Sequence, residues 1–427
     1  MKKTIFLIII FAVSASYSLF AQRSQAFPGA EGFGKYASGG RMGSVYHVTN
    51  LNDSGEGSLR DAVSKPRRIV IFDVGGVIKI ESPLRFSENL TIAGQTAPGE
   101  GITVYGSSIS FTNANNLICR YIRFRLGDSG AKGADAVSIG NGFNMIFDHV
   151  SVSWGKDENF SISSMAVVGG PTSITLQNSI IGQGLADHSM GGLIQSDGGI
   201  TLYRNLYIDN RSRNVKAKGI NQFVNNVVYN WVVGAYILGD SEFTSFCNIT
   251  DNYFIRGSAS RAKPFTRGNK NFSLYAVDNY YDDNLNGVLD GHLLSQQEYD
   301  VNTWSETPFD FYPIKKMSAK DAYNWIVKYV GCNFPARDAV DNYMIDELKS
   351  VGTRGKLIET ESELPVKVNL AKQWKTSVID TDRDGMPDQW EKDHNLDPNN
   401  PKDARPFGLS LQYTNIEVYL NSIVPAE

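Results

Sequence analysis

Asparagine residues recur through the middle of this 427-residue chain at a nearly constant spacing. Each stands between two short apolar runs, as in SITLQ-N-SIIGQ and ITLYR-N-LYIDN, and the same frame extends upstream to His149 and Tyr121. Successive positions are roughly 21 to 29 residues apart, a period that is typical of solenoid repeats. The asparagines in this frame are Asn178, Asn205, Asn226, Asn252 and Asn279.

The apolar runs on either side of these asparagines indicate β-strands. They are only a few residues long, are rich in Val, Ile, Phe and Tyr, and show no helical period. Asparagine tolerates the left-handed backbone of a tight turn and can form hydrogen bonds with its counterpart in the next coil. We therefore predict an all-β fold, a parallel β-helix. A β-sandwich with asparagine turns is the alternative.

The chain divides into three segments. Residues 1–21 have the features of a secretory signal peptide, because Lys2 and Lys3 precede an apolar run that ends near Ala21. We expect a solenoid domain over 22–310, with its coils at about 70–285, and a mixed helical and loop extension over 311–427. The predicted location is therefore secreted or periplasmic.

Two short segments are predicted to be helical. The run GSLRDAVSK near the N-terminus is expected to cap the open end of the solenoid, as terminal repeats require. In the extension, MSAKDAYNWIVKYVG has a helical period that places Ala322, Trp325, Ile326 and Tyr329 on one side.

Composition excludes several classes of partner and cofactor. The formal charge is −4 and would become −6 without Lys2 and Lys3, which argues against nucleic acid or an anionic membrane as a partner. Past the leader, no stretch is long and apolar enough to span a bilayer. Three scattered cysteines are too few for a disulfide framework or a zinc site. We expect a monomer, because a capped solenoid needs no second copy.

An acidic loop near the C-terminus matches a calcium-binding loop. Acidic side chains at alternate positions can wrap a hard cation, Gly385 permits the sharp turn, and a backbone carbonyl supplies position 7. We expect this loop to hold a structural Ca²⁺ that fastens the extension. The predicted ligands are Asp380, Asp382, Asp384, Met386, Asp388 and Glu391.

A second charged group lies between the coils. The turn NRSRNVKAKG carries four cations, which suit a polyanion with regularly spaced carboxylates. Two coils upstream are Asp135, Asp157 and Glu158, which adjacent coils could bring together to hold a Ca²⁺. The alternative is that these acids form salt bridges with the arginines. The four cations are Arg211, Arg213, Lys216 and Lys218.

The chain resembles a bacterial pectate lyase of polysaccharide lyase family 1. The motifs that carry the resemblance span nearly all of the chain after residue 21: FPGAEGFG, VTNLNDSGEGSLRDAV, TIAGQTAPGEGI, ADAVSI, FDHVSVSW, NRSRNVKAKG and the calcium loop. The resemblance implies a right-handed parallel β-helix that cleaves polygalacturonate by β-elimination with Ca²⁺. An acidic polysaccharide is then the expected substrate, and unsaturated oligogalacturonates are the expected products.

The family's motifs assign roles to individual residues. Its proton-abstracting arginine matches Arg213, and the last arginine of the same motif matches Lys218, which keeps the charge but not the two-pronged grip on a carboxylate. Val215 replaces the usual proline. Lys216 and Arg211 are expected to contact substrate with Lys218. The family's calcium acids match Asp135 and Asp157.

Three positions depart from the family's pattern or need a separate reading. Ser161 stands where an acid is expected, so we expect Glu158 to supply that ligand. His188 lies where the family has a lysine that grips substrate, and it either takes over this role or is structural. His149 belongs to the family's Trp-Ile-Asp-His pattern, and we expect it to be buried and structural.

Other functions remain as alternatives. A pectin lyase would act on methyl-esterified chains and would replace the calcium acids with cations. A glycoside hydrolase on this fold would use paired carboxylates, for which Asp135, Asp157 and Asp187 are candidates. A non-catalytic solenoid that binds glycans is the third alternative.

Overall fold

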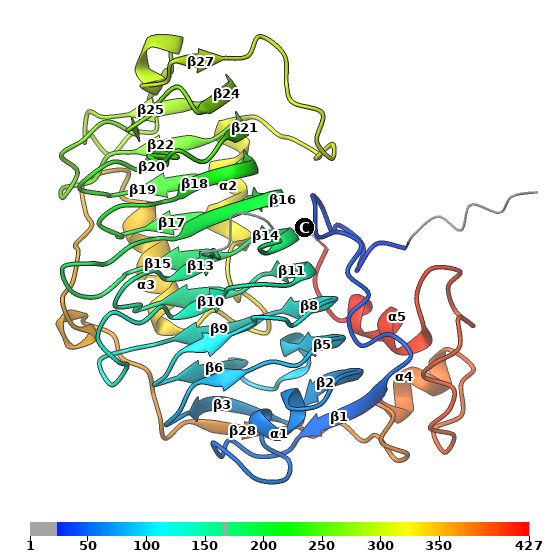
Figure 1. The fold of residues 1–427 in the computed structure, drawn as a ribbon. Helices are drawn as coiled ribbons and strands as arrows, with labels where there is room; N and C mark the ends of the chain where they lie inside the picture. The colour runs from blue at the N-terminus through cyan, green and yellow to red at the C-terminus, as the bar shows by residue number, and fades with distance from the viewer. Residues whose placement is uncertain (1–23, 165–168, 427) are drawn as a thin grey trace, which may run out of the picture.

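The computed structural model describes residues 24–164 and 169–426, and the predicted signal peptide lies outside them. The strands stack into a solenoid with three faces (Figure 1). Strands of neighbouring coils pair in parallel, which excludes the β-sandwich alternative. Face 1 comprises β1 (Ser44–Val48), β2 (Arg68–Phe72), β5 (Leu90–Ala93), β8 (Leu117–Arg120), β11 (Phe143–Asp148), β14 (Thr172–Gln177), β16 (Leu193–Tyr203), β18 (Lys216–Val224), β21 (Ser245–Thr250), β24 (Phe272–Val277) and β27 (Thr303–Trp304).

Face 2 is narrower and shares its long strands with face 1. Its strands are β4 (Leu84–Arg85), β7 (Ile109–Ser110), β10 (Val137–Ile139), β13 (Phe160–Ile162), the first halves of β16 and β18, β20 (Tyr236–Leu238) and β23 (Phe265–Thr266). Face 3 is a separate sheet, with β28 (Gln373–Lys375), β3 (Val74–Lys79), β6 (Ile102–Tyr105), β9 (Ile122–Arg125), β12 (Ser151–Ser153), β15 (Ile180–Gly182), β17 (Leu206–Ile208), β19 (Val227–Tyr229), β22 (Tyr253–Ile255), β25 (Tyr280–Asp282) and β26 (His292–Leu293).

The asparagine ladder lies at the corner between faces 1 and 3, with a register that differs from the prediction by one residue. Asn178 has the left-handed backbone of the turn, but the residue aligned with it in the next coil is Arg204. Asn205 aligns with Ser179, and the buried ladder runs from Ser179 through Asn205, Asn226 and Asn252 to Asn279. Two adjacent residues thus divide the two tasks, because the first adopts the turn conformation and the second bonds across coils.

Each ladder asparagine is fixed to its neighbours by both ends of its amide. The backbone N–H of Asn205 donates to Oδ1 of Asn226 at 2.9 Å, and that of Asn226 donates to Oδ1 of Asn252 at 2.7 Å. Nδ2 of Asn226 donates to the carbonyl of Leu202 at 2.9 Å, in the preceding coil. Buried backbone groups at the turn therefore find partners, and each coil is held in one register.

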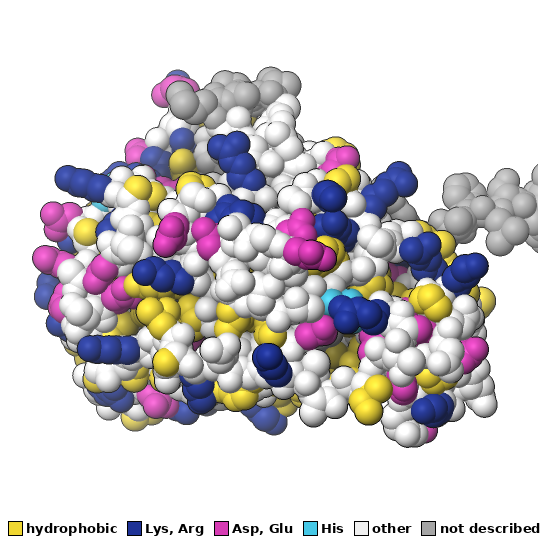
Figure 2. Space-filling view, turned by 90° about the horizontal axis from the view of Figure 1, so that it is seen from below, with side chains coloured by type: hydrophobic (Ala, Val, Ile, Leu, Met, Phe, Trp, Pro, Cys, Tyr) yellow, Lys and Arg dark blue, Asp and Glu magenta, His cyan; other side chains and the backbone are white. Residues whose placement is uncertain are grey.

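The two ends of the solenoid are closed differently. At the N-terminal end, α1 (Leu59–Val63) begins at Ser58, whose side chain accepts from the N–H of Asp61, and its apolar residues join the interior core, as predicted. Figure 2 shows this end from below, where acidic and basic side chains are interspersed. At the other end, β26 pairs antiparallel with β25.

The extension returns along the solenoid and covers face 3. Here α2 (Ala319–Tyr329) and α3 (Ala339–Leu348) share an apolar cluster with residues of β15, β17, β19 and β22 (Figure 1). The side of α2 that is buried differs from the prediction. Ala322 and Ile326 are buried as expected, but Ala319 and Tyr323 complete that side, whereas Trp325 and Tyr329 are only partly buried.

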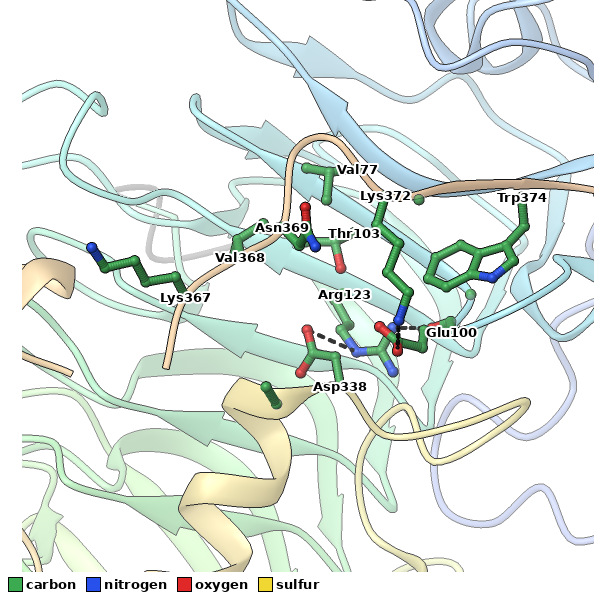
Figure 3. A pocket seen from close by; sticks show the side chains of 13 residues that line it. Val77, Glu100, Thr103, Arg123, Asp338, Lys367, Val368, Asn369, Lys372 and Trp374 are labelled. Carbon is green, nitrogen blue, oxygen red and sulfur yellow. Dashed lines mark hydrogen bonds and ion pairs between the residues drawn. The ribbon is translucent and has the colours of Figure 1, made fainter. Parts of the chain in front are cut away.

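Buried charges fix α3 to the sheet. Arg125 on β9 donates to both Asp338 (2.9 Å, to Oδ1) and Asp341 (2.8 Å), and Arg123 lies 3.3 Å from Asp341. Ser151 on β12 donates to the same Asp341 at 2.7 Å. Arg123 and Asp338 also line a cavity of about 250 Å³ between face 3 and the extension (Figure 3).

The remaining elements complete the description. Helices α4 (Asp388–Asp393) and α5 (Asn415–Ser422) lie outside β1, β2 and β5 (Figure 1). The 3-10 helices are Gly94–Thr96, Gln296–Tyr299 and Glu361–Glu363. Cys119, Cys247 and Cys332 are buried free thiols. Among the described residues, none of the helices combines the length and apolar character needed to cross a lipid bilayer.

We predict that Asn226→Ala destabilises the solenoid by about 1–3 kcal/mol, because the N–H of Asn205 loses its buried acceptor. Denaturant unfolding followed by circular dichroism measures the change. Asn52→Ala is the control, since Asn52 is exposed, and it should leave the midpoint unchanged. Equal midpoints for both variants would contradict the assigned role of the ladder.

Candidate functional site

Three acids meet at the corner where face 3 leads into face 2. Asp135 precedes β10, and Asp157 and Glu158 precede β13 one coil later. One carboxylate oxygen from each lies within 4.8 Å of the others. The backbone N–H of Glu158 donates to Oδ1 of Asp135 at 3.0 Å, which ties the two coils together. The sequence prediction that these acids gather in space is therefore confirmed.

Arg213 reaches this acid group from two coils further along. It precedes β18 and has a left-handed backbone with φ of 51°. Its guanidinium Nη1 contacts Oε1 of Glu158. Isolated bridges align Glu158 with Met190 and Met190 with Ser212, so the residue before Arg213 stacks over the acid group. The guanidinium thus points toward the carboxylates and is partly exposed.

A second buried asparagine network supports these loops, and the sequence analysis did not identify it. Nδ2 of Asn159 donates to Oδ1 of Asn210 at 2.8 Å, and Nδ2 of Asn210 donates to Oδ1 of Asn214 at 2.9 Å. Asn159 directly follows Glu158, Asn210 directly precedes Arg211, and Asn214 directly follows Arg213. Asn159 and Asn210 are 51 residues apart, which is about two repeats. That spacing was the one feature of the sequence that could have indicated the network.

Burial and the charges of neighbouring carboxylates raise the pKa values of two of the acids. Burial, followed by the charges of Asp135 and Asp157, raises the pKa of Glu158 to about 8. Burial also raises the pKa of Asp135 to about 6. Arg213 offsets only part of this repulsion. The group is therefore arranged to receive a cation, because three ionised carboxylates at this spacing repel one another.

Ser161 does not join the acids. It lies on β13, is buried, and its hydroxyl donates to the carbonyl of Leu193 at 3.4 Å. Glu158 instead completes the acid group, as the sequence analysis expected. Asp187 is exposed and is not part of any group of three acids found in the described residues.

The predicted cations occupy one strand and the loop before it. Lys216 and Lys218 are both half-buried on the outer side of β18. Burial, and then the charges of Lys216 and Arg213, lower the pKa of Lys218. Lys216 forms an ion pair with Asp240 at 3.0 Å. Arg211 lies on the loop, and among the described residues no ion pair joins its side chain to the acids.

The two histidines lie in different places. Nδ1 of His188 is 2.6 Å from Oδ1 of Asp157, so His188 borders the acid group and is half-exposed. His149 is buried at the asparagine corner, with its ring stacked on Tyr121 at 4.8 Å between ring centres. Buried placement agrees with the predicted structural role of His149.

The acidic loop forms a second group, next to α4. Oxygens of Asp380, Asp382 and Asp384 lie within 4.8 Å of one another, and Asp384 also groups with Glu391 and Asp403. Neither carboxylate oxygen of the buried Glu391 has a hydrogen-bond partner in the described chain. Burial, then the charge of Asp382, raises the pKa of Asp384 to about 8 and that of Glu391 to about 7.

Asp388, one member of the predicted loop set, has a different placement from the other acids. The carboxylate of Asp388 accepts from the N–H and the hydroxyl of Thr381, both at 2.8 Å, and it is absent from both acid groups found in the described residues. Met386 has its side chain in an apolar cluster with Ile69 and Ile71 of β2. Asp403 was missed because it lies 12 residues beyond Glu391, outside the loop's own spacing.

Curated relatives match almost the entire chain. "Probable pectate lyase C" of Neosartorya fischeri is 50% identical over 418 residues, covering 96% of this chain and 97% of that protein. "Probable pectate lyase C" of Emericella nidulans is 51% identical over 405 residues, covering 94% and 93%. The chain belongs to the pectate lyase family. These relatives are fungal, so the bacterial assignment in the sequence analysis is not supported.

Solved structures agree with the fold. The cedar pollen allergen jun a 1 superposes with a TM-score of 0.52 at 19% identity, over 71% of this chain and 92% of that chain. A pectate lyase bound to a hexasaccharide superposes with a TM-score of 0.55 at 15% identity, over 73% and 98%. No protein-family model matches the chain. At these identities the structural matches support the parallel β-helix alone.

Proposed function

We propose that this chain is a secreted pectate lyase that cleaves polygalacturonate by calcium-assisted β-elimination, with Arg213 as the base. The observation that carries the proposal is the contact between Arg213 and Glu158, which holds a guanidinium against a group of acids at a partly exposed corner. Membership of the pectate lyase family supports the reaction class.

The residues of the acid group fit a Ca²⁺ ion. Asp135, Asp157 and Glu158 offer carboxylate oxygens only, which hard cations prefer, and their partial burial and mutual repulsion favour a positive partner. When bound, the ion would neutralise a uronate carboxylate and so stabilise the charge that develops as the proton on C5 leaves.

The chain's own residues supply the other parts of the reaction. Lys218 can bind substrate carboxylates from the adjacent strand, whereas Lys216 on the same strand is paired with Asp240. Arg213 first releases its own proton to water; the neutral guanidine then accepts the proton from C5, the C4–O bond breaks, a C4=C5 double bond forms, and the departing oxygen takes a proton from water. Glu158 belongs both to the acid group and to the Arg213 contact, so Arg213 must lose this carboxylate partner before it can accept a proton.

We predict that Arg213→Lys lowers kcat at least about 100-fold, because a misplaced ammonium replaces the base. The measurement is ultraviolet absorbance of unsaturated oligogalacturonates, with circular dichroism and calcium titration to verify that folding and metal binding persist. Arg261→Lys is the matched control, since Arg261 is exposed and donates only to nearby carbonyls of Ser258 and Ser260. Substantial lyase activity in Arg213→Lys would remove Arg213 from this role.

We also predict that calcium binding at the acid group releases a proton near pH 7. Because the pKa of Glu158 is raised to about 8, this carboxyl is largely protonated there without metal, and calcium affinity should weaken as pH falls from 8 to 6. Calorimetry in buffers of different ionisation enthalpy measures the release. In Glu158→Gln the proton release at the acid group should be lost, whereas any proton release at the acidic loop should remain. An unchanged proton release in Glu158→Gln would contradict this assignment.

For the acidic loop we propose a structural Ca²⁺ held by Asp380, Asp382, Asp384 and Glu391, with Asp403 completing the shell in place of Asp388. The buried, unpartnered oxygens of Glu391 support this set. The loop packs against face 1, where Met386 contacts the cluster of Ile69 and Ile71, and Nε2 of His47 lies 3.2 Å from the Arg383 carbonyl.

We therefore predict that Asp403→Asn reduces the rise in thermal midpoint that calcium gives. A ligand present at a hundred times its Kd stabilises a protein by about 2.7 kcal/mol, and losing one ligand removes part of this. Scanning calorimetry with calcium and with a chelator compares Asp403→Asn with Asp388→Asn, which should respond almost as the unmodified protein does. The reverse order would restore Asp388 as the ligand.

A further inference from the structure

Three charged side chains from successive coils form a row that begins on β18, the strand that follows Arg213. Lys216 lies on β18, Asp240 follows β20, and Arg267 follows β23. One oxygen of Asp240, Oδ2, lies 3.0 Å from Nζ of Lys216 and 3.3 Å from Nη1 of Arg267. Parallel pairing of β18 with β20 and of β20 with β23 sets this row along the solenoid axis.

The row is on the surface and contributes little to stability. The side chains of Asp240 and Arg267 are 40% and 50% exposed, so their ion pair is weak, whereas the side chain of Lys216 is 15% exposed. Partial burial alone would raise the pKa of Asp240, but the hydrogen bond and the charge of Lys216 lower it. Asp240 therefore lies between two cations that favour its ionised form.

The row continues the cations of the candidate site. Lys218 shares the outer side of β18 with Lys216, and Arg213 lies on the loop before them. Neighbouring coils are about 4.8 Å apart, a distance on the scale of one sugar unit. A polyuronate lying along the axis would thus present about one carboxylate to each coil.

We propose that Asp240 weakens the preference of this part of face 2 for a free uronate, so that it also accepts a neutral, methyl-esterified sugar. Its carboxylate already lies between Lys216 and Arg267, so a free acid meets a net charge of +1 instead of +2 and a carboxylate that already pairs with both cations. An esterified unit meets no such repulsion. This inference rests on the proposed function, because it assumes that this part of face 2 binds galacturonan.

The direction in which Asp240→Asn changes the affinity for an acidic substrate distinguishes two roles for Asp240. If Asp240 only positions Lys216 for an acidic substrate, removing its charge should weaken binding of that substrate. If Asp240 competes with the substrate, Asp240→Asn should free both cations and strengthen binding. The asparagine keeps the size of the side chain and can still accept a hydrogen bond, so folding should be preserved.

The experiment compares binding of a de-esterified oligogalacturonate with that of its methyl ester. Calorimetry is done in the Arg213→Lys background, with and without Asp240→Asn, so that cleavage does not consume the ligand. We expect binding of the free acid to tighten about three- to tenfold, with steeper salt dependence, and binding of the ester to change little. Weaker or unchanged binding of the free acid would overturn the proposal.

A matched control removes a similar carboxylate elsewhere. Asp346 forms an exposed pair with Lys349 at 3.2 Å on the outside of α3, and Asp346→Asn should alter neither affinity. Equal tightening in Asp346→Asn would also overturn the proposal, because net charge alone would explain it. Formation of unsaturated product by the unmodified protein is assayed separately, so failure of the lyase function is distinguishable from failure of this binding preference.

Discussion

The contact between Glu158 and Arg213 depends on the register of successive coils, because the two residues are 55 positions apart and on different turns. A slip of one residue in a strand turns every side chain to the opposite face. Buried amide networks prevent such slips at two corners, one through Asn205, Asn226 and Asn252, the other through Asn159 and Asn210. The geometry of the candidate site is therefore a consequence of polar groups inside the solenoid.

The same rigid frame explains why the acids stay together although they repel one another. The backbone N–H of Glu158 donates to the carboxylate of Asp135, and the flanking strands anchor both loops, so the acids cannot move apart to relieve the repulsion. Burial, and then this repulsion, raise the pKa of Glu158. A scaffold that holds like charges in place is pre-organised for a cation, and the acidic loop repeats this principle at Asp384 and Glu391.

Much of the fold was predictable from the sequence, because the asparagine period and the short apolar runs reflect local constraints. The one-residue offset at Asn178 was not, since a turn residue and a ladder residue both favour asparagine and stand next to each other. Gathering of Asp135, Asp157 and Glu158 followed from the repeat. Asp403 and the pairing of Asp240 with Arg267 did not, because they depend on how separate segments pack. Trp325 was misplaced for the same reason, as the side of α2 that is buried is set by the sheet beneath it.

The most direct test of the account is whether the protein forms unsaturated product from polygalacturonate in a calcium-dependent manner. Ultraviolet absorbance should rise with time in the presence of Ca²⁺, stop when a chelator is added, and resume when Ca²⁺ is restored. Cleavage that generates new reducing ends without this absorbance would mean hydrolysis, and it would contradict the assignment of Arg213 and the acid group to an elimination.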